Sequence, residues 1–114
     1  MEQYQLLIIY FKFGQKSKKL SFWQKLWNSS LSNQLLKAAK EQKILQENIF
    51  NASAGYLGDE NIVYNLSELP PLKNTVCLEL IDEELKLQTF LKDNEAELQE
   101  AVSILLHPIV QIIL

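Results

Sequence analysis

The stretch Tyr4–Phe13, YQLLIIYFKF, decides the fold class. It is rich in β-branched and aromatic residues and is followed by Gly14, which together predict a β-strand. Its apolar residues do not alternate with polar ones, because the run Leu6–Phe11 places apolar side chains on both faces of the strand. That pattern is typical of a strand that is buried on both sides.

The rest of the chain predicts a helix, two strands, a second helix and a last strand. Apolar residues at helical spacing mark each helix, and β-branched or aromatic runs mark each strand. Pro108 ends the second helix, because proline has no amide N–H to donate. The expected elements are a helix over about 21–42, strands over 44–54 and 75–81, a helix from 82 to 107 and a strand over 109–113, with a turn over 55–59 and a short extended piece over 62–66.

Polar residues mark the expected starts of both helices. Ser21 offers a hydroxyl N-cap with Gln24 three residues later, as in a capping box, and the Asn28-Ser29-Ser30 patch is a weak point of the first helix. Asp82, Glu83 and Glu84 suit the start of the second helix, where carboxylates meet the positive end of the helix dipole. The same acidic cluster could bind a hard cation, but a helix start is the more common reason for such a run.

This order of elements is the split βαβ, or ferredoxin-like, arrangement. The expected fold is therefore α+β, a single domain over residues 1–114 with a βαββαβ order and two helices on one face of a four-stranded antiparallel sheet. The other face has no helix to cover it, yet the first strand and the run Ile109–Leu114 are apolar on both sides. We therefore expect a homo-oligomer whose bare sheet faces pack together. The alternative is that longer loops of the same chain cover this face.

Charge and composition argue against nucleic-acid binding. The net charge of −3 is divided between residues 1–50, with eight Lys and three Glu, and residues 51–114, with three Lys and eleven acids. The chain has no Arg, the preferred residue for forked contacts to phosphates and bases. An RNA-recognition domain has the same element order but stacks bases on aromatic residues of its third strand, and the run Thr75–Ile81 has none.

Residues for catalysis or metal binding are scarce. His107 and Cys77 are the only residues of their types, so one chain cannot supply a tetrahedral zinc site. A Cys77–His107 dyad is conceivable, but a thiol in the middle of an apolar strand usually behaves as a small hydrophobe. We therefore expect no enzyme activity, no metal and no cofactor. The apolar runs are too short to cross a membrane, and a single cysteine agrees with a reducing, cytoplasmic compartment.

Two other features are candidates for binding. The glycines of Gly55-Tyr56-Leu57-Gly58 would let backbone amides approach a phosphate, although the stretch lacks the Lys-Ser/Thr of a P-loop and also suits an ordinary turn. Trp23 and Trp27 lie one helical turn apart. They suit the core or a subunit interface, and the alternative is a ridge that binds a partner.

Several short strings resemble the PII-like proteins of the "domain of unknown function 190" group. These strings are Leu7-Ile8-Ile9-Tyr10, Ile49-Phe50-Asn51-Ala52 with Gly55-Tyr56, Leu66-Ser67-Glu68-Leu69-Pro70, and Val76 through Ile81-Asp82-Glu83-Glu84 to Phe90-Leu91. The resemblance implies a homotrimer with inward-facing sheets that binds a small effector or nucleotide in clefts between subunits. It also implies that a mobile loop between the second and third strands, here about Gly55 to Leu66, contacts a target protein.

The site residues that follow from the loop and the resemblance are Gly55, Tyr56, Leu57, Gly58, Asn65, Ser67 and Glu68. Three departures from the family pattern bear on ligand binding. The stretch between the first strand and the family-like part of the first helix is several residues longer and carries Phe22, Trp23 and Trp27. Asn51-Ala52 replaces the usual Arg-Gly, which removes a basic residue for phosphate, and Leu72–Asn74 is additional. The expected function is a regulatory, ligand-sensing protein without catalysis. The alternative is a protein interaction module that acts through the long first helix and its tryptophans, with no small-molecule ligand.

Overall fold

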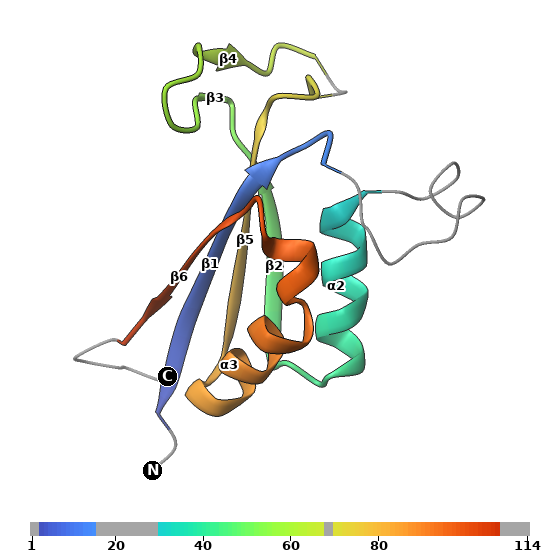
Figure 1. Ribbon diagram of the computed structural model, residues 1–114, viewed down its shortest axis with the longest axis vertical. Helices are drawn as coiled ribbons and strands as arrows, with labels where there is room; N and C mark the ends of the chain where they lie inside the picture. The colour runs from blue at the N-terminus through green and yellow to red at the C-terminus, as the bar shows by residue number, and fades with distance from the viewer. Residues whose placement is uncertain (1–2, 16–29, 68–69, 108–114) are drawn as a thin grey trace.

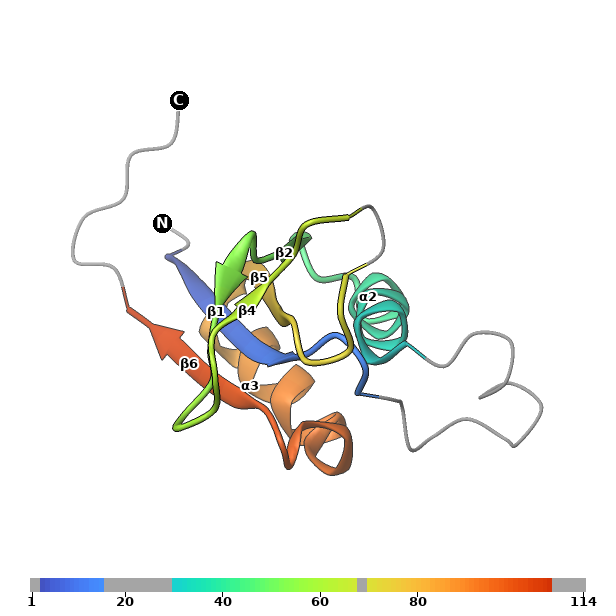
Figure 2. The same cartoon turned by 90° about the horizontal axis from the view of Figure 1, so that it is seen from above.

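A computed structural model describes residues 3–15, 30–67 and 70–107 (Figure 1). Its main sheet has four antiparallel strands in the order β2-β5-β1-β6. Helices α2 and α3 lie on the same side of this sheet (Figure 2), so the ferredoxin-like fold expected from the sequence is confirmed. The strands of the main sheet are β1 (Tyr4–Lys12), β2 (Gln46–Asn51), β5 (Thr75–Glu83) and β6 (Val102–Leu106).

The central strand β1 is buried on one face only. Leu7, Ile9 and Phe11 point toward the helices and are almost fully buried, whereas Leu6 and the other alternate residues of β1 are half-buried. The strand predicted over Tyr4–Phe13 is therefore confirmed. Both helices cover the same face of β1, so within the described residues its predicted burial on both sides is met on that face only.

The core lies between the sheet and the two helices. Buried and half-buried side chains alternate along both β1 and β5, and the buried ones are paired across the two strands. Every second side chain of each strand therefore points into the layer between the sheet and the helices. The helices contribute leucines at helical spacing, together with Ala39 and Phe90. The buried apolar residues are Leu7, Ile9, Phe11, Leu31, Leu35, Ala39, Val76, Leu78, Leu80, Leu87, Phe90 and Leu98.

Helix α2 (Leu31–Glu41) begins at the weak point foreseen in the sequence. Ser30 is its N-cap, and the Ser30 hydroxyl accepts a hydrogen bond from the Asn33 amide at 3.3 Å. The structure thus contains the second half of the helix predicted over 21–42. The predicted cap at Ser21 and both tryptophans lie outside the described residues.

The second helix is shorter than the sequence predicted. Helix α3 (Glu84–Asp93) ends where the buried Asn94 side chain donates to the Phe90 carbonyl at 2.8 Å, and a 3-10 turn (η1, Glu95–Leu98) follows. Residues 102–106 form strand β6 rather than helix, since they pair with the free edge of β1. The prediction failed because Leu98, Ala101, Val102 and Leu105 fit a helical spacing as well as a strand. The last strand predicted over 109–113 lies outside the described residues.

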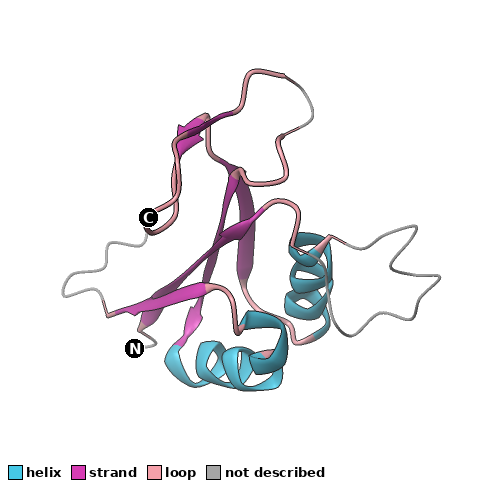
Figure 3. Cartoon of the chain, turned by 45° about the horizontal axis from the view of Figure 1, so that its top comes forward, coloured by secondary structure: helices cyan, strands magenta, loops and turns pink. Residues whose placement is uncertain are grey.

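The described part of the connection between β2 and β5, residues 52–67 and 70–74, projects beyond the sheet, and we call it the arm (Figure 3). Within it β3 (Ala54–Gly55) and β4 (Val63–Tyr64) pair as a short antiparallel ladder. This agrees with the turn predicted over 55–59 and the extended piece predicted over 62–66.

Backbone contacts fasten both roots of the arm to the sheet. The Ala52 amide donates to the Thr75 carbonyl at 2.9 Å, and the Gly14 amide donates to the Leu72 carbonyl at 2.8 Å. Gly14 must lack a side chain here, because a Cβ would lie 3.0 Å from both the Leu72 Cβ and its carbonyl oxygen. An ion pair between Lys12 and Glu60 adds a contact from β1 to the middle of the arm.

Candidate functional site

Among the described residues of the arm and its root, three buried oxygen atoms have no hydrogen-bond partner. They are Asn65 Oδ1, Asn74 Oδ1 and Thr75 Oγ1. Asn74 is fully buried, and its Nδ2 donates to the Ala52 carbonyl at 3.1 Å, which fixes the carboxamide in place. Buried polar atoms in folded proteins are nearly always paired with protein, water or ligand. These residues are therefore candidates for contacting a bound molecule.

Backbone pairing brings several of these residues to one end of the sheet. The Asn65 amide donates to the Ser53 carbonyl at 2.9 Å, next to the contact between Ala52 and Thr75. Gly55 lies beside Thr75, because a Cβ built on Gly55 would be 3.7 Å from Thr75 Oγ1. We call Gly55, Asn65, Asn74 and Thr75 the root site.

The chemistry of the root site favours a ligand group that donates hydrogen bonds. A carboxamide oxygen only accepts hydrogen bonds, and a threonine hydroxyl both donates and accepts. The unpaired oxygens of Asn65 and Asn74 therefore suit a hydroxyl group, an amino group or a water rather than a phosphate oxygen. This agrees with the absence of a basic residue at Asn51-Ala52, where the resembling family has Arg-Gly.

The site residues predicted from the sequence fall into two groups. Gly55 and Asn65 belong to the root site, while Tyr56 is exposed and Gly58 turns the outer end of the arm with a positive φ of 61°. Leu57 is half-buried and Ser67 is exposed beyond β4. Glu68, Trp23 and Trp27 lie outside the described residues.

Sequence reasoning missed Asn74 and Thr75 as site residues. Asn74 was seen only as part of an insertion relative to the resembling family, and Thr75 only as the first residue of a strand. An asparagine between a double proline and a buried strand could have been a signal, since such residues often hold turns by side-chain hydrogen bonds.

One lysine beside the arm, Lys12, and one within it, Lys73, act on Glu60. Lys12 donates to the Glu60 carboxylate. This hydrogen bond lowers the pKa of Glu60, and the charges of Lys12 and Lys73 contribute in the same direction. The positive charge of Lys12 is thus already matched within the chain.

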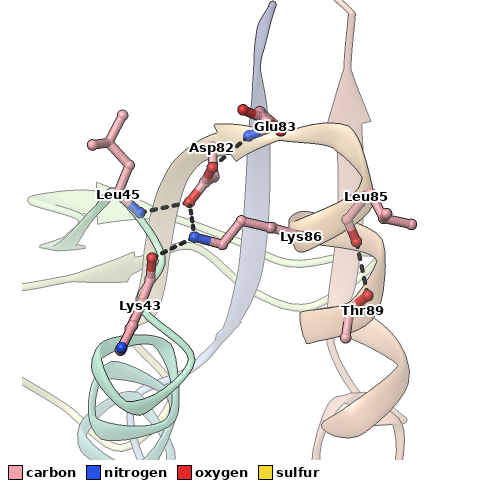
Figure 4. Close-up of polar contacts among 7 residues, drawn as sticks. All are labelled: Lys43, Leu45, Asp82, Glu83, Leu85, Lys86 and Thr89. Carbon is pink, nitrogen blue, oxygen red and sulfur yellow. Dashed lines mark hydrogen bonds and ion pairs between the residues drawn. The ribbon is translucent and has the colours of Figure 1, made fainter. Parts of the chain in front are cut away.

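The acidic cluster at Asp82 forms a structural junction (Figure 4). The buried Asp82 carboxylate accepts hydrogen bonds from the Glu83 amide at 2.7 Å and the Leu45 amide at 2.8 Å, and it pairs with Lys86 at 3.1 Å. Lys86 also donates to the Lys43 carbonyl at 2.6 Å. One side chain thus joins the end of β5, the start of α3 and the turn that leads into β2.

Electrostatics keep this carboxylate ionised. Burial alone raises the pKa of Asp82, but the Glu83 amide, the Lys86 side chain and the Leu45 amide together bring it below its usual range. The cluster therefore serves the start of α3, as expected, and no cation is needed to explain it. Among the residues that the structure describes, no three His, Cys, Asp or Glu side chains gather as a metal site.

An apolar hollow of about 340 Å³ lies next to this junction. It lies between the C-terminal end of α2 and the outer side of α3, where Leu85 is largely exposed. Its described lining residues carry no buried unpaired polar atom, in contrast to the root site. These lining residues are Gln42, Ile44, Leu85, Lys86, Thr89 and Asp93.

The sheet face opposite the helices is open, and we call it the open face. Cross-strand pairing arranges its side chains in three rows of four across β6, β1, β5 and β2. The six positions on β6 and β1 are all apolar, and the polar ones lie on β5 and β2. The rows are Leu106–Leu6–Ile81–Gln46, Ile104–Ile8–Glu79–Asn48 and Val102–Tyr10–Cys77–Phe50.

Cys77 is a half-buried member of this open face. Burial and the nearby Glu79 raise the pKa of its thiol, although a hydrogen bond with Tyr10 opposes the rise. Cys77 is paired with Tyr10, whereas His107 follows the residue paired with Leu6 and so lies level with Gln5. Five residues along β1, or about 17 Å, therefore separate the two positions. His107 instead lies 3.8 Å from Glu84. A Cys77–His107 dyad is therefore not formed.

Glu47 is an acidic residue placed on the helix side of β2, opposite the buried Leu80. Both of its carboxyl oxygens are buried and neither has a hydrogen-bond partner. Desolvation raises the pKa of Glu47 to about 8. The folded protein therefore holds this proton at neutral pH, whereas the unfolded chain releases it near pH 4.5.

We expect Glu47→Gln to stabilise the protein in mildly alkaline solution. Because the folded state binds the proton more tightly, the wild-type free energy of unfolding falls as the pH rises from about 4.5 to about 8. The glutamine removes this fall, so the variant should gain about 2 kcal/mol at pH 8 and almost nothing at pH 4. Urea unfolding at both pH values, with the exposed Glu41→Gln as control, measures the difference. An equal gain at the two pH values would contradict the assignment.

Comparison with known proteins shows the fold but no family. No protein-family profile matches the chain, and no curated protein matches it in sequence. Solved structures match it over most of its length. A PII-like signalling protein from Thermus thermophilus has a TM-score of 0.59 at 13% identity, covering 92% of this chain and 86% of its own.

Two further solved structures with a similar fold carry names that describe different functions. CPII, a nitrogen regulatory PII-like protein from Thiomonas intermedia K12 bound to ADP, AMP and bicarbonate, has a TM-score of 0.55 at 10% identity, with 90% and 83% of the two chains covered. The divalent ion tolerance protein CutA1 from Ehrlichia chaffeensis has a TM-score of 0.54 at 16% identity, with 98% and 87% covered. The chain thus has the ferredoxin-like fold of PII-like and CutA proteins, and identities this low do not transfer a ligand.

The structure also bears on membrane crossing. Over residues 3–15, 30–67 and 70–107, none of the helices has the length and apolar character that a transmembrane span requires.

Proposed function

We propose that this chain is a non-catalytic, PII-like regulatory protein that binds a small effector at the root site and signals through the arm. The observation that carries the proposal is the set of buried, unpaired oxygens on Asn65, Asn74 and Thr75. These atoms lie where the arm joins the sheet, so a bound molecule would change the contacts that fasten the arm. A target protein would then contact the outer end of the arm, around Gly58.

The open face supports a homotrimer as the working assembly. Val102, Ile104 and Leu106 on β6 are 55%, 43% and 43% exposed in one chain, next to half-buried apolar residues of β1. An apolar sheet face of this extent is a predicted association surface. A cleft between subunits would enclose the root site, as the resemblance to the domain of unknown function 190 group implies. The cytoplasm is the compartment that we propose for this protein.

Adenine nucleotides are the first ligands to test, because their ribose hydroxyls and amino group are hydrogen-bond donors. The ADP and AMP held by the structurally similar CPII support the same choice. We expect isothermal titration calorimetry with AMP, ADP and ATP, each with and without bicarbonate, to detect binding of at least one of them.

Variants of the root site should weaken this binding. Asn65→Ala and Thr75→Val each remove one hydrogen bond to the ligand and should lower affinity roughly 10-fold, equivalent to about 1.4 kcal/mol. The exposed arm residue Asn61 supplies the control, and Asn61→Ala should bind like the wild type. Absence of binding across the nucleotides and common metabolites would refute the effector, and would favour an interaction module without a small ligand.

A further inference from the structure

Side chains in the second half of the arm alternate between exposed and half-buried. Ile62, Tyr64 and Leu66 are 57%, 58% and 89% exposed, and the residues between them, Val63 and Asn65, are half-buried. This period of two is that of an extended strand with an inner and an outer side. We call Ile62, Tyr64 and Leu66 the outer stripe.

The outer stripe departs from the usual polarity of a surface ribbon, although the inner side keeps one apolar residue, Val63. Half-buried positions of a strand normally carry apolar side chains, and exposed positions carry polar ones. Here the inner side includes Asn65 with its buried, unpaired oxygen, and every position of the outer stripe is a large apolar residue. Such a pattern is favourable in water only if another surface covers the outer stripe in the working state.

The described part of the chain does not bring the arm down onto its own sheet. The Gly14–Leu72 and Ala52–Thr75 backbone hydrogen bonds hold the two roots, and the Lys12–Glu60 ion pair holds the segment before Ile62. With the arm fastened in this position, none of the residues that the structure describes covers the outer stripe. A cover from another molecule would remove these side chains from water.

We propose that the outer stripe packs against a second copy of this chain in the assembled protein. Two observations favour a second copy over an unrelated protein. Phe50, the residue before the last one of β2, is a 48% exposed member of the open face, so the apolar surface of the open face reaches the root of the arm. Apart from the Lys12–Glu60 pair within each chain, residues 52–67 carry one acid, Asp59, and no cation, while residues 1–50 hold seven Lys and three Glu, a net charge of +4, so these two segments of neighbouring copies are opposite in charge.

This inference rests on the proposed homotrimer and adds the arm to its interface. In such an assembly the inner side of the arm would face the root site, and the outer stripe would hold the arm on the neighbouring subunit. Effector binding and subunit contact would then act on opposite sides of the same short ribbon.

The test combines a triple variant with a photo-crosslinker in the full chain. Ile62→Ser, Tyr64→Ser and Leu66→Ser together should weaken association at least 100-fold in sedimentation equilibrium. The matched control is Leu85→Ser, which removes a 74% exposed leucine of α3 outside the outer stripe and should leave association unchanged. p-Benzoylphenylalanine in place of Tyr64 should crosslink subunits to one another on irradiation, and in place of Leu85 it should not.

The outcomes separate this inference from the proposed function. Suppose that the wild type is a trimer, that the triple variant associates equally well, and that position 64 gives no crosslink between subunits. The role of the outer stripe is then refuted, whereas the trimer is supported. A crosslink from position 64 to a different protein alone also refutes it. A monomeric wild type refutes the homotrimer and this contact together, while nucleotide binding at the root site would still be measured independently. Circular dichroism of the triple variant serves as the folding control. A wild-type spectrum would show that a loss of association does not come from unfolding.

Discussion

Ile104→Glu is expected to convert the assembled protein into monomers at micromolar concentration. Ile104 lies in the middle row of the open face, next to Ile8 of β1, and is 43% exposed in one chain. A carboxylate at this position would be buried without a partner when subunits pack together, which costs several kcal/mol per subunit. The same side chain remains in water in the monomer, so the fold should survive.

Ser103→Glu is the matched control for this experiment. Ser103 is the exposed neighbour of Ile104 on β6, but it is paired with the buried Ile9 and so belongs to the helix side of the sheet. Analytical ultracentrifugation should show a trimer for the wild type and for Ser103→Glu, and a monomer for Ile104→Glu. If Ile104→Glu associates as strongly as the wild type, then the open face is not the interface.

The distribution of residues on the open face indicates which part of it forms the contact. The positions on β6 and β1 are apolar in all three rows, whereas Gln46, Asn48 and Glu79 make the β2 side mixed. Charged residues are depleted in the buried centre of interfaces and tolerated at the rim. The centre of the contact should therefore lie over β1 and β6, with β2 near its edge.

Asp82→Ala is expected to lower the free energy of unfolding by about 3 kcal/mol. The substitution leaves the Glu83 and Leu45 amides without their acceptor and removes the ionic partner of the Lys86 side chain. Three elements lose their common contact at once, so the effect should exceed that of an ordinary surface ion pair. Urea denaturation near pH 7 measures it, and Asp59→Ala in the exposed part of the arm serves as control.

The pH dependence gives a second measurement of the same contact. The pKa of Asp82 is lowered in the folded state, so its stabilisation is complete above the unfolded pKa near 3.8 and is lost as the pH falls through the folded value. The unfolding free energies of the wild type and Asp82→Ala should therefore converge in acid. A constant difference between pH 7 and pH 2 would mean that the carboxylate charge is not what stabilises the junction.

The fold could be predicted from the sequence because its central elements carry unambiguous signals. The continuous apolar run of β1 fits only a strand, and Asp82, Glu83 and Glu84 mark the passage from β5, which ends at Glu83, into α3, which begins at Glu84. Residues 98–106 fit two kinds, and only the free edge of β1 decides between them. Which edge of β1 is free follows from the order of strands in the sheet, and the local spacing of apolar residues does not reveal that order.

The candidate site was predictable only in part for a similar reason. Gly55 and Asn65 were found because turn residues and the family resemblance mark the loop. Asn74 and Thr75 enter the root site through contacts with Ala52 and Gly55, about twenty residues away. The buried carboxyl oxygens of Glu47 were also missed, since a glutamate in an alternating edge strand looks solvent-exposed until the helix layer is placed.

The few residues after β1 serve two neighbours at once. Gly14 holds the arm through Leu72, and the Gln15 carbonyl accepts a hydrogen bond from the Leu31 amide at the first turn of α2. Two adjacent residues, Gly14 and Gln15, thus connect a root of the arm to the beginning of a helix in the core layer. A force on the outer end of the arm should therefore change how stably the first turn of α2 is formed.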